Sequence, residues 1–87
     1  MLSGTEKEIK YANDVIKEWR EHANTKKKFF ESKKPNADGI KLLNRAMDIL
    51  DERIAKESWA KDIIANRTTK KFDYEQIFYD LMQGKIK

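Results

Sequence analysis

Lysine and aromatic side chains gather in one short stretch of this chain, and together they could bind a macromolecule. Residues 25–34, TKKKFFESKK, hold five lysines and one glutamate, so their charge is +4, the same as the net charge of all 87 residues. Ammonium groups attract phosphates and carboxylates, and an exposed aromatic ring can stack on a base or fill an apolar pocket. We name this stretch the lysine–aromatic junction, and its candidate partner-binding residues are Lys26, Lys27, Lys28, Phe29, Lys33 and Lys34.

A second basic stretch, RTTKK at residues 67–71, adds Arg67, Lys70 and Lys71 to the candidates. Lysines at a helix end also complement the helix dipole, which explains part of the charge of the junction but not its two adjacent phenylalanines. Neighbouring residues of a helix point about 100° apart, so if one of Phe29 and Phe30 turns into the core, the other is hard to bury on the same helix. Burial of both would make the junction mostly a helix end. If one of them is exposed, we expect the junction to be a binding surface.

Catalysis receives little support from the residue types. His22 is the only histidine, and Glu18 lies one turn before it, so a carboxylate–imidazole pair is geometrically available. A general base also needs a pocket and a nucleophile, and the surrounding helix face is charged. We therefore expect a surface histidine and a protein that is not an enzyme.

Metal and cofactor sites are equally weakly indicated. Acids at residues 48, 51 and 52 are spaced to share a helix face, but Arg45 can pair with them, and carboxylate metal sites usually need a second helix. The chain has no cysteine, and its three glycines are isolated. We expect no metal site and no cofactor.

Length and composition limit the architecture. Eighty-seven residues suffice for one domain, residues 1–87, and 39% of them are charged against roughly 25% in an average globular chain. No apolar run approaches the roughly 20 residues of a membrane span, and the first residues lack the pattern of a signal peptide. We expect a protein of the cytoplasm that does not enter a membrane.

Apolar side chains recur at spacings of three and four, which is typical of amphipathic helices. Thr5 and Glu8 form a capping-box pattern, which predicts a first helix from Thr5 to about Glu31. The residue before Pro35 is disfavoured in a helix, so the first helix ends there. Asp38 is the predicted N-cap of a second helix.

The register of the second helix breaks after Ile54, and Ser58 could cap a short third helix that ends near Asn66. A single rod over residues 38–66 is the alternative. Asp73 predicts the cap of a final helix that Gly84 closes. The fold class is therefore all-α, a small helical bundle of three main helices and one short extra helix. Its predicted core is Ile9, Ala12, Ile16, Trp19, Leu43, Met47, Leu50, Trp59, Ile63, Ile77, Phe78 and Leu81.

Two segments resemble a recurring pattern. Residues 2–16, LSGTEKEIKYANDVI, and residues 58–67, SWAKDIIANR, are similar to small uncharacterised all-α accessory proteins of phages, plasmids and integrated elements. Those proteins open with L-[ST]-G-[ST]-E-K-Q-[IV]-x-[WY]-A-E and carry a later A-x-W-W-I-D-N-R segment. This chain has Glu8 in place of the usual Gln and Asn13 in place of the usual Glu, and it lacks the second Trp.

The resemblance transfers no site residues, because the pattern carries no known active site. It implies a setting in which small helical proteins bind and block a host protein or bind DNA, and inhibitors of host defence nucleases are one such class. We expect a non-catalytic interaction module with a protein partner. The alternative is a nucleic-acid-binding protein with both basic stretches on phosphates, and a monomer and a homodimer both remain open.

Overall fold

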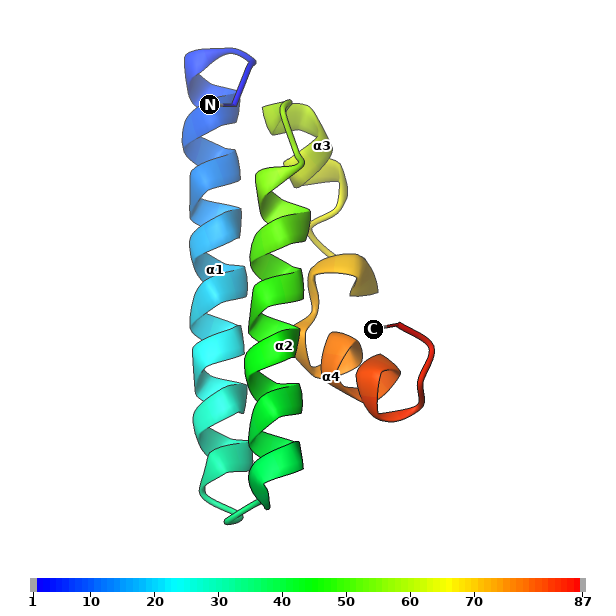
Figure 1. The fold of residues 1–87 in the computed structure, drawn as a ribbon. Coiled ribbons are helices and arrows are strands. Elements are labelled where there is room, and N and C mark those ends of the chain that lie inside the picture. The colour runs from blue at the N-terminus through cyan, green and yellow to red at the C-terminus, as the bar shows by residue number, and fades with distance from the viewer. Residues whose placement is uncertain (1, 87) are drawn as a thin grey trace.

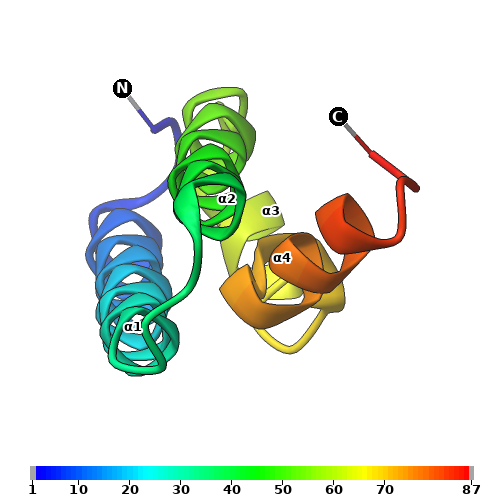
Figure 2. The ribbon, with the colours of Figure 1, turned by 60° about the horizontal axis from the view of Figure 1, so that its bottom comes forward.

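The computed structural model of the protein describes residues 2–86, and within them it is all-α. Figure 1 shows α1 and α2 side by side and antiparallel, with the remaining helices returning along them. The view in Figure 2 shows α3 and α4 on the same side of the α1–α2 pair. The elements are α1 (Glu6–Glu31), α2 (Ala37–Ala55), α3 (Ala60–Ala65), a 3-10 turn η1 (Lys70–Phe72) and α4 (Tyr74–Met82). This confirms three main helices and a short extra one.

The capping box at the start of α1 is present as predicted. The Thr5 hydroxyl accepts a hydrogen bond from the backbone N–H of Glu8 at 3.1 Å, and the backbone N–H of Thr5 donates to Glu8 Oε1 at 2.9 Å. The hydrogen bond from the backbone N–H of Thr5 lowers the pKa of the Glu8 carboxyl below its ordinary value, and the Thr5 side chain lowers it further. The helix then continues to Glu31, where residues 32–34 turn toward Pro35.

The second helix begins two residues earlier than predicted. Asn36 is its N-cap, and the Asn36 side chain accepts a hydrogen bond from the backbone N–H of Gly39 at 2.8 Å. Asp38, the predicted cap, lies in the first turn, where its negative charge still complements the helix dipole. Both residue types are good caps, and Asn36 takes the position because the turn after Pro35 has already brought the chain into place.

Residues 38–66 form two helices rather than one rod, because α2 ends at Ala55 and α3 starts at Ala60. The predicted cap and the predicted burial at this break are both wrong. Trp59, not Ser58, is the N-cap of α3, and its side chain is 51% exposed instead of lying in the core. The backbone at Trp59 is extended, which turns its ring outward, and Ala60 fills the buried position.

The extended backbone at the break pairs with the amino-terminal segment. The N–H of Ser3 donates to the carbonyl of Ser58 at 2.7 Å, and the N–H of Ala60 donates to the carbonyl of Ser3 at 2.8 Å. Gly4 follows with a φ of 151°, and a Cβ placed there would lie 3.2 Å from the Cβ of Ala60. The two segments that carry the sequence resemblance therefore touch, and Gly4 is needed for that close approach.

The core is one cluster that joins all the helices. Of the predicted core residues, seven are buried: Ala12, Trp19, Leu43, Leu50, Ile63, Ile77 and Leu81. Four more are half-buried and pack against that cluster: Ile9, Ile16, Met47 and Phe78. The sequence analysis missed two of the largest buried side chains, Phe72 and Tyr74, which frame the start of α4.

Phe72 and Tyr74 bind the region after α3 to the two long helices. The Phe72 ring stacks on Trp19 of α1 with ring centroids 4.2 Å apart and an interplanar angle of 6°. The Tyr74 hydroxyl donates to the carbonyl of Leu43 in α2 at 2.7 Å, and burial raises the pKa of Tyr74 to about 12. The segment between α3 and α4 is therefore anchored to both long helices.

Candidate interaction surface

Arg67, at the start of the second basic stretch, is engaged by α1. Its Nη1 donates to the Tyr11 hydroxyl at 2.6 Å, and its Nη2 lies 3.6 Å from Glu18 Oε1. The guanidinium also lies over the Tyr11 ring, 5.6 Å from the centroid. Arg67 therefore holds the chain after α3 against α1, and its charge is partly compensated.

Lys70 and Lys71 are also paired with acids inside the fold. Lys70 Nζ lies 3.4 Å from Asp73 Oδ2, and Lys71 Nζ lies 3.2 Å from Glu57 Oε1. The backbone carbonyl of Lys71 accepts a hydrogen bond from Arg53 of α2 at 2.8 Å. All three predicted binding residues of this stretch thus have partners in the protein itself.

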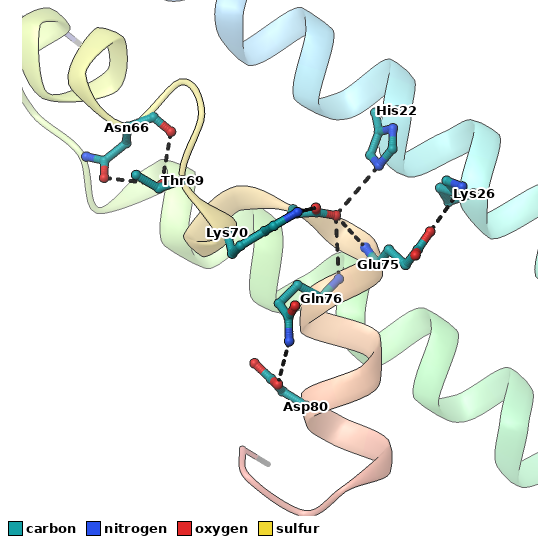
Figure 3. A network of polar contacts seen from close by, with 9 residues as sticks. His22, Lys26, Asn66, Thr69, Lys70, Glu75, Gln76 and Asp80 are labelled. Atoms are coloured by element: carbon teal, nitrogen blue, oxygen red, sulfur yellow. Dashed lines mark hydrogen bonds and ion pairs between the residues drawn. The ribbon is translucent and has the colours of Figure 1, made fainter.

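The first lysine of the junction belongs to the same polar network, which Figure 3 shows at the start of α4. Lys26 Nζ lies 3.0 Å from Glu75 Oε2, and His22 Nε2 lies 3.6 Å from Asp73 Oδ1. Asp73 also caps α4 by accepting from the backbone N–H groups of Glu75 and Gln76. His22 is therefore an exposed histidine whose carboxylate neighbour comes from α4, while Glu18 pairs with Arg67.

A shallow pocket of about 190 Å³ adjoins this network. Its polar groups are bound to each other: His22 and Lys70 lie against Asp73, and the Thr69 hydroxyl donates to the carbonyl of Asn66 at 3.0 Å. No hydroxyl is seen donating to His22, as nucleophile activation would require. The pocket is lined by Trp19, His22, Arg67, Thr68, Thr69, Lys70, Phe72 and Asp73.

The acids of α2 are spread among arginines. Asp51 pairs with Arg20 of α1, and Glu52 Oε1 lies 3.3 Å from Arg45 Nη1. Within residues 2–86, no three His, Asp or Glu side chains are arranged to hold a metal ion. No helix in that part of the chain combines the length and the apolarity needed to cross a membrane.

The two phenylalanines of the junction have different environments. Phe30 turns inward, and its ring stacks on Phe78 of α4 with centroids 5.0 Å apart. Phe29 is 53% exposed and touches Phe30 edge-on, with centroids 5.8 Å apart. The exposed ring of Phe29 thus meets the condition that we set for a binding surface.

The remaining lysines of the junction lie in the same stretch as Phe29 and have no acidic partners among residues 2–86. Lys33 Nζ lies over the Phe29 ring, 4.9 Å from its centroid. Among the residues that the structure describes, Lys27, Lys28, Lys33 and Lys34 form no ion pair, although Lys27 is half-buried. Four of the nine predicted residues are therefore paired within the fold, and five, including Phe29, remain available to a partner.

Lys34 has an unusual backbone conformation. Its φ is 55°, in the left-handed region that glycine and asparagine adopt most readily at helix ends. A lysine in this region costs about 1 kcal/mol relative to glycine. Stability alone would therefore favour glycine at this turn.

The aromatic cluster, which we define as Phe29, Phe30, Phe78 and Tyr79, extends the surface beyond the junction. The Tyr79 ring lies 6.5 Å from Phe30 and 6.1 Å from Phe78, and it is 40% exposed. Met82, one turn after Phe78, is 57% exposed. We did not predict these α4 residues as binding residues, because residues 78 and 82 fit the core stripe of the helix equally well.

The fold and this surface define the protein as a small all-α bundle with a basic, partly aromatic face. Comparisons with protein-family models, curated proteins and solved structures give no match. Function therefore has to be argued from the side chains themselves.

Proposed function

We propose that the protein is a non-catalytic interaction module that binds a macromolecular partner, a protein, through the lysine–aromatic junction. The single observation that carries the proposal is the exposed Phe29 ring among lysines without acidic partners. An exposed aromatic side chain next to basic residues is the composition of protein-binding hot spots, in which the ring supplies buried area and the charges supply orientation.

The second basic stretch gives the nucleic-acid alternative less support than its sequence suggested. A phosphate contact needs a free ammonium or guanidinium group, but Arg67, Lys70 and Lys71 have partners in the fold. Binding DNA would exchange those ion pairs for phosphate contacts. The junction alone offers four lysines, which is a small footprint for a nucleic-acid-binding protein.

The resemblance to accessory proteins of mobile elements supports a host protein as the partner, and a host defence nuclease is the specific version that we propose. Nucleases hold DNA on basic surfaces, which repel a basic junction. Inhibition through this surface would therefore not be mimicry of DNA. It would act at an acidic face of the nuclease, away from the channel that holds DNA.

The test compares the wild-type chain with two variants, Phe29→Ser and the double variant Lys27→Ala/Lys28→Ala, as baits in lysate of the organism that carries the gene. We expect mass spectrometry to identify one protein that the wild type recovers and that both variants lose. The matched control is Lys7→Ala/Lys10→Ala, which removes the same charge from the other end of α1 and should leave recovery unchanged.

A salt series with random DNA and RNA separates the two functions. Nucleic-acid binding that weakens steeply with salt, with a slope that falls by about 2 in Lys27→Ala/Lys28→Ala, would favour the alternative. A partner protein recovered equally well by the wild type and both junction variants would contradict our proposal.

A further inference from the structure

The exposed apolar side chains near Phe29 continue onto α4, and this continuity extends the binding surface. We propose that the lysine–aromatic junction and the α4 residues Tyr79 and Met82 form one docking surface for an acidic segment of the partner protein that carries an apolar anchor. The inference rests on the proposed function and adds to it the second half of the surface and the chemistry of the bound segment.

The rings of the aromatic cluster form a continuous apolar surface across α1 and α4. Phe30 of α1 stacks on Phe78 and contacts two further rings, Phe29 with centroids 5.8 Å apart and Tyr79 with centroids 6.5 Å apart. Met82 shares a helix face with Phe78 and Tyr79, because residues three and four apart are neighbours on a helix. An apolar side chain of the partner placed over Phe30 would thus touch exposed rings from both helices.

The charged side chains near Phe29 of α1 differ from those on α4 near Tyr79. Lys33 lies over the Phe29 ring, Lys27 and Lys28 directly precede Phe29 in α1, and all three lysines have no acidic partners among residues 2–86. On α4 the acids Glu75 and Asp80 already have partners in the fold, since Glu75 pairs with Lys26 and Asp80 accepts a hydrogen bond from the Gln76 side chain at 3.0 Å. The charges therefore favour a segment with its acids over the α1 end and its apolar side chain toward α4.

Other exposed aromatic residues lack this combination. Trp59 is exposed to a similar degree, 51%, and has Lys61 5.5 Å from its ring centroid. Among residues 2–86 Trp59 makes no ring–ring contact, so it lies outside the aromatic cluster. Trp59 is therefore the matched control for an exposed aromatic side chain outside the proposed surface.

The experiment selects peptides from a random displayed library on the full chain and measures their binding by fluorescence anisotropy. We expect the enriched peptides to combine acidic residues with an aromatic or large aliphatic residue. Their affinity should fall about tenfold or more in the double variant Tyr79→Ser/Met82→Ser and in Lys27→Ala/Lys28→Ala. Trp59→Ser should bind as the wild type does, and circular dichroism should show that each variant is folded.

The outcomes distinguish this inference from the function on which it rests. Peptides whose binding needs Lys27, Lys28 and Phe29 but not Tyr79 and Met82 would overturn the α4 half of the surface and leave the proposed function in place. Enriched peptides without acids would overturn the chemistry assigned to the partner. If no peptide is enriched, or if single-stranded DNA competes with every peptide through the same lysines, both the inference and a protein partner are contradicted.

Discussion

The two basic stretches look alike in the sequence and differ in the folded protein. In residues 67–71 every basic side chain is paired with an acid, and the following Phe72 is buried against Trp19. Within residues 2–86, Lys26 is the one junction lysine with such a partner, Glu75, and the ring of Phe29 is exposed. Charge density along the chain therefore does not separate these two stretches, whereas the pairing of their charges within the fold does.

The paired residues of the second stretch are expected to stabilise the fold, whereas the unpaired residues of the junction are available to a partner. Measurements of stability and binding can test this division. Substitutions in the second stretch and its anchors should change stability. Substitutions of the available junction residues should leave stability nearly unchanged and change binding. The following predictions are ordered from the largest expected effect to the smallest.

The largest effect is expected from Phe72→Ala. Removing a fully buried ring costs about 3–5 kcal/mol of unfolding free energy, because it leaves a cavity against Trp19. Phe29→Ala should change the unfolding free energy by less than about 0.5 kcal/mol, since that ring is half in solvent. Urea denaturation followed by circular dichroism measures both.

A second variant covers the case in which Phe72→Ala does not fold. Phe72→Leu keeps an apolar side chain and loses the stack, and we expect it to cost about 1–2 kcal/mol. Equal effects of Phe72→Leu and Phe29→Leu would show that the two stretches do not differ as the structure indicates.

An intermediate loss of unfolding free energy is expected from a substitution of Tyr74. Its hydroxyl bonds the segment after the second stretch to Leu43 of α2. Tyr74→Phe should cost about 1 kcal/mol, the usual net value of one hydrogen bond. The wild type should also lose stability as the pH rises from about 10 to about 12. The unfolded chain releases its tyrosine proton near the ordinary value of 10, whereas the folded chain holds it to about 12.

Tyr74→Phe is also the control for that pH dependence, because the other tyrosines and the lysines titrate in both proteins. The difference in unfolding free energy between wild type and variant should be constant below pH 10 and should shrink above it. A difference that stays constant up to pH 12 would contradict the raised pKa of Tyr74.

The helices could be predicted from the sequence because their signals are local. The Thr5–Glu8 capping box, the apolar spacing and the Asp73 cap act within one or two turns, and the structure confirms them. The features that were predicted wrongly, the cap of α3 and the burial of Trp59, depend on contacts between residues far apart in the sequence. Trp59 is exposed because the chain at the break pairs with Ser3, which lies 56 residues away in sequence.

The candidate surface could be predicted only in part for the same reason. Residue types and spacing identified the junction. They also indicated that Phe29 and Phe30 are hard to bury together on one helix. They could not show that Lys26 and Lys71 have acidic partners, because those partners come from other parts of the chain. Nor could they show that Tyr79 reaches Phe30 from α4.

The smallest effect is expected from the lysines themselves, and it tests the comparison most directly. Lys70→Ala and Lys71→Ala should each lower the unfolding free energy by about 0.5 kcal/mol, because exposed ion pairs contribute little, and added salt should reduce the difference. Lys27→Ala/Lys28→Ala should cost nothing or stabilise slightly, because it removes repulsion among neighbouring lysines. Thermal unfolding at low and high salt measures these differences. A larger loss from the junction pair than from the paired lysines would reverse the assignment, making the junction a helix end that stabilises the fold.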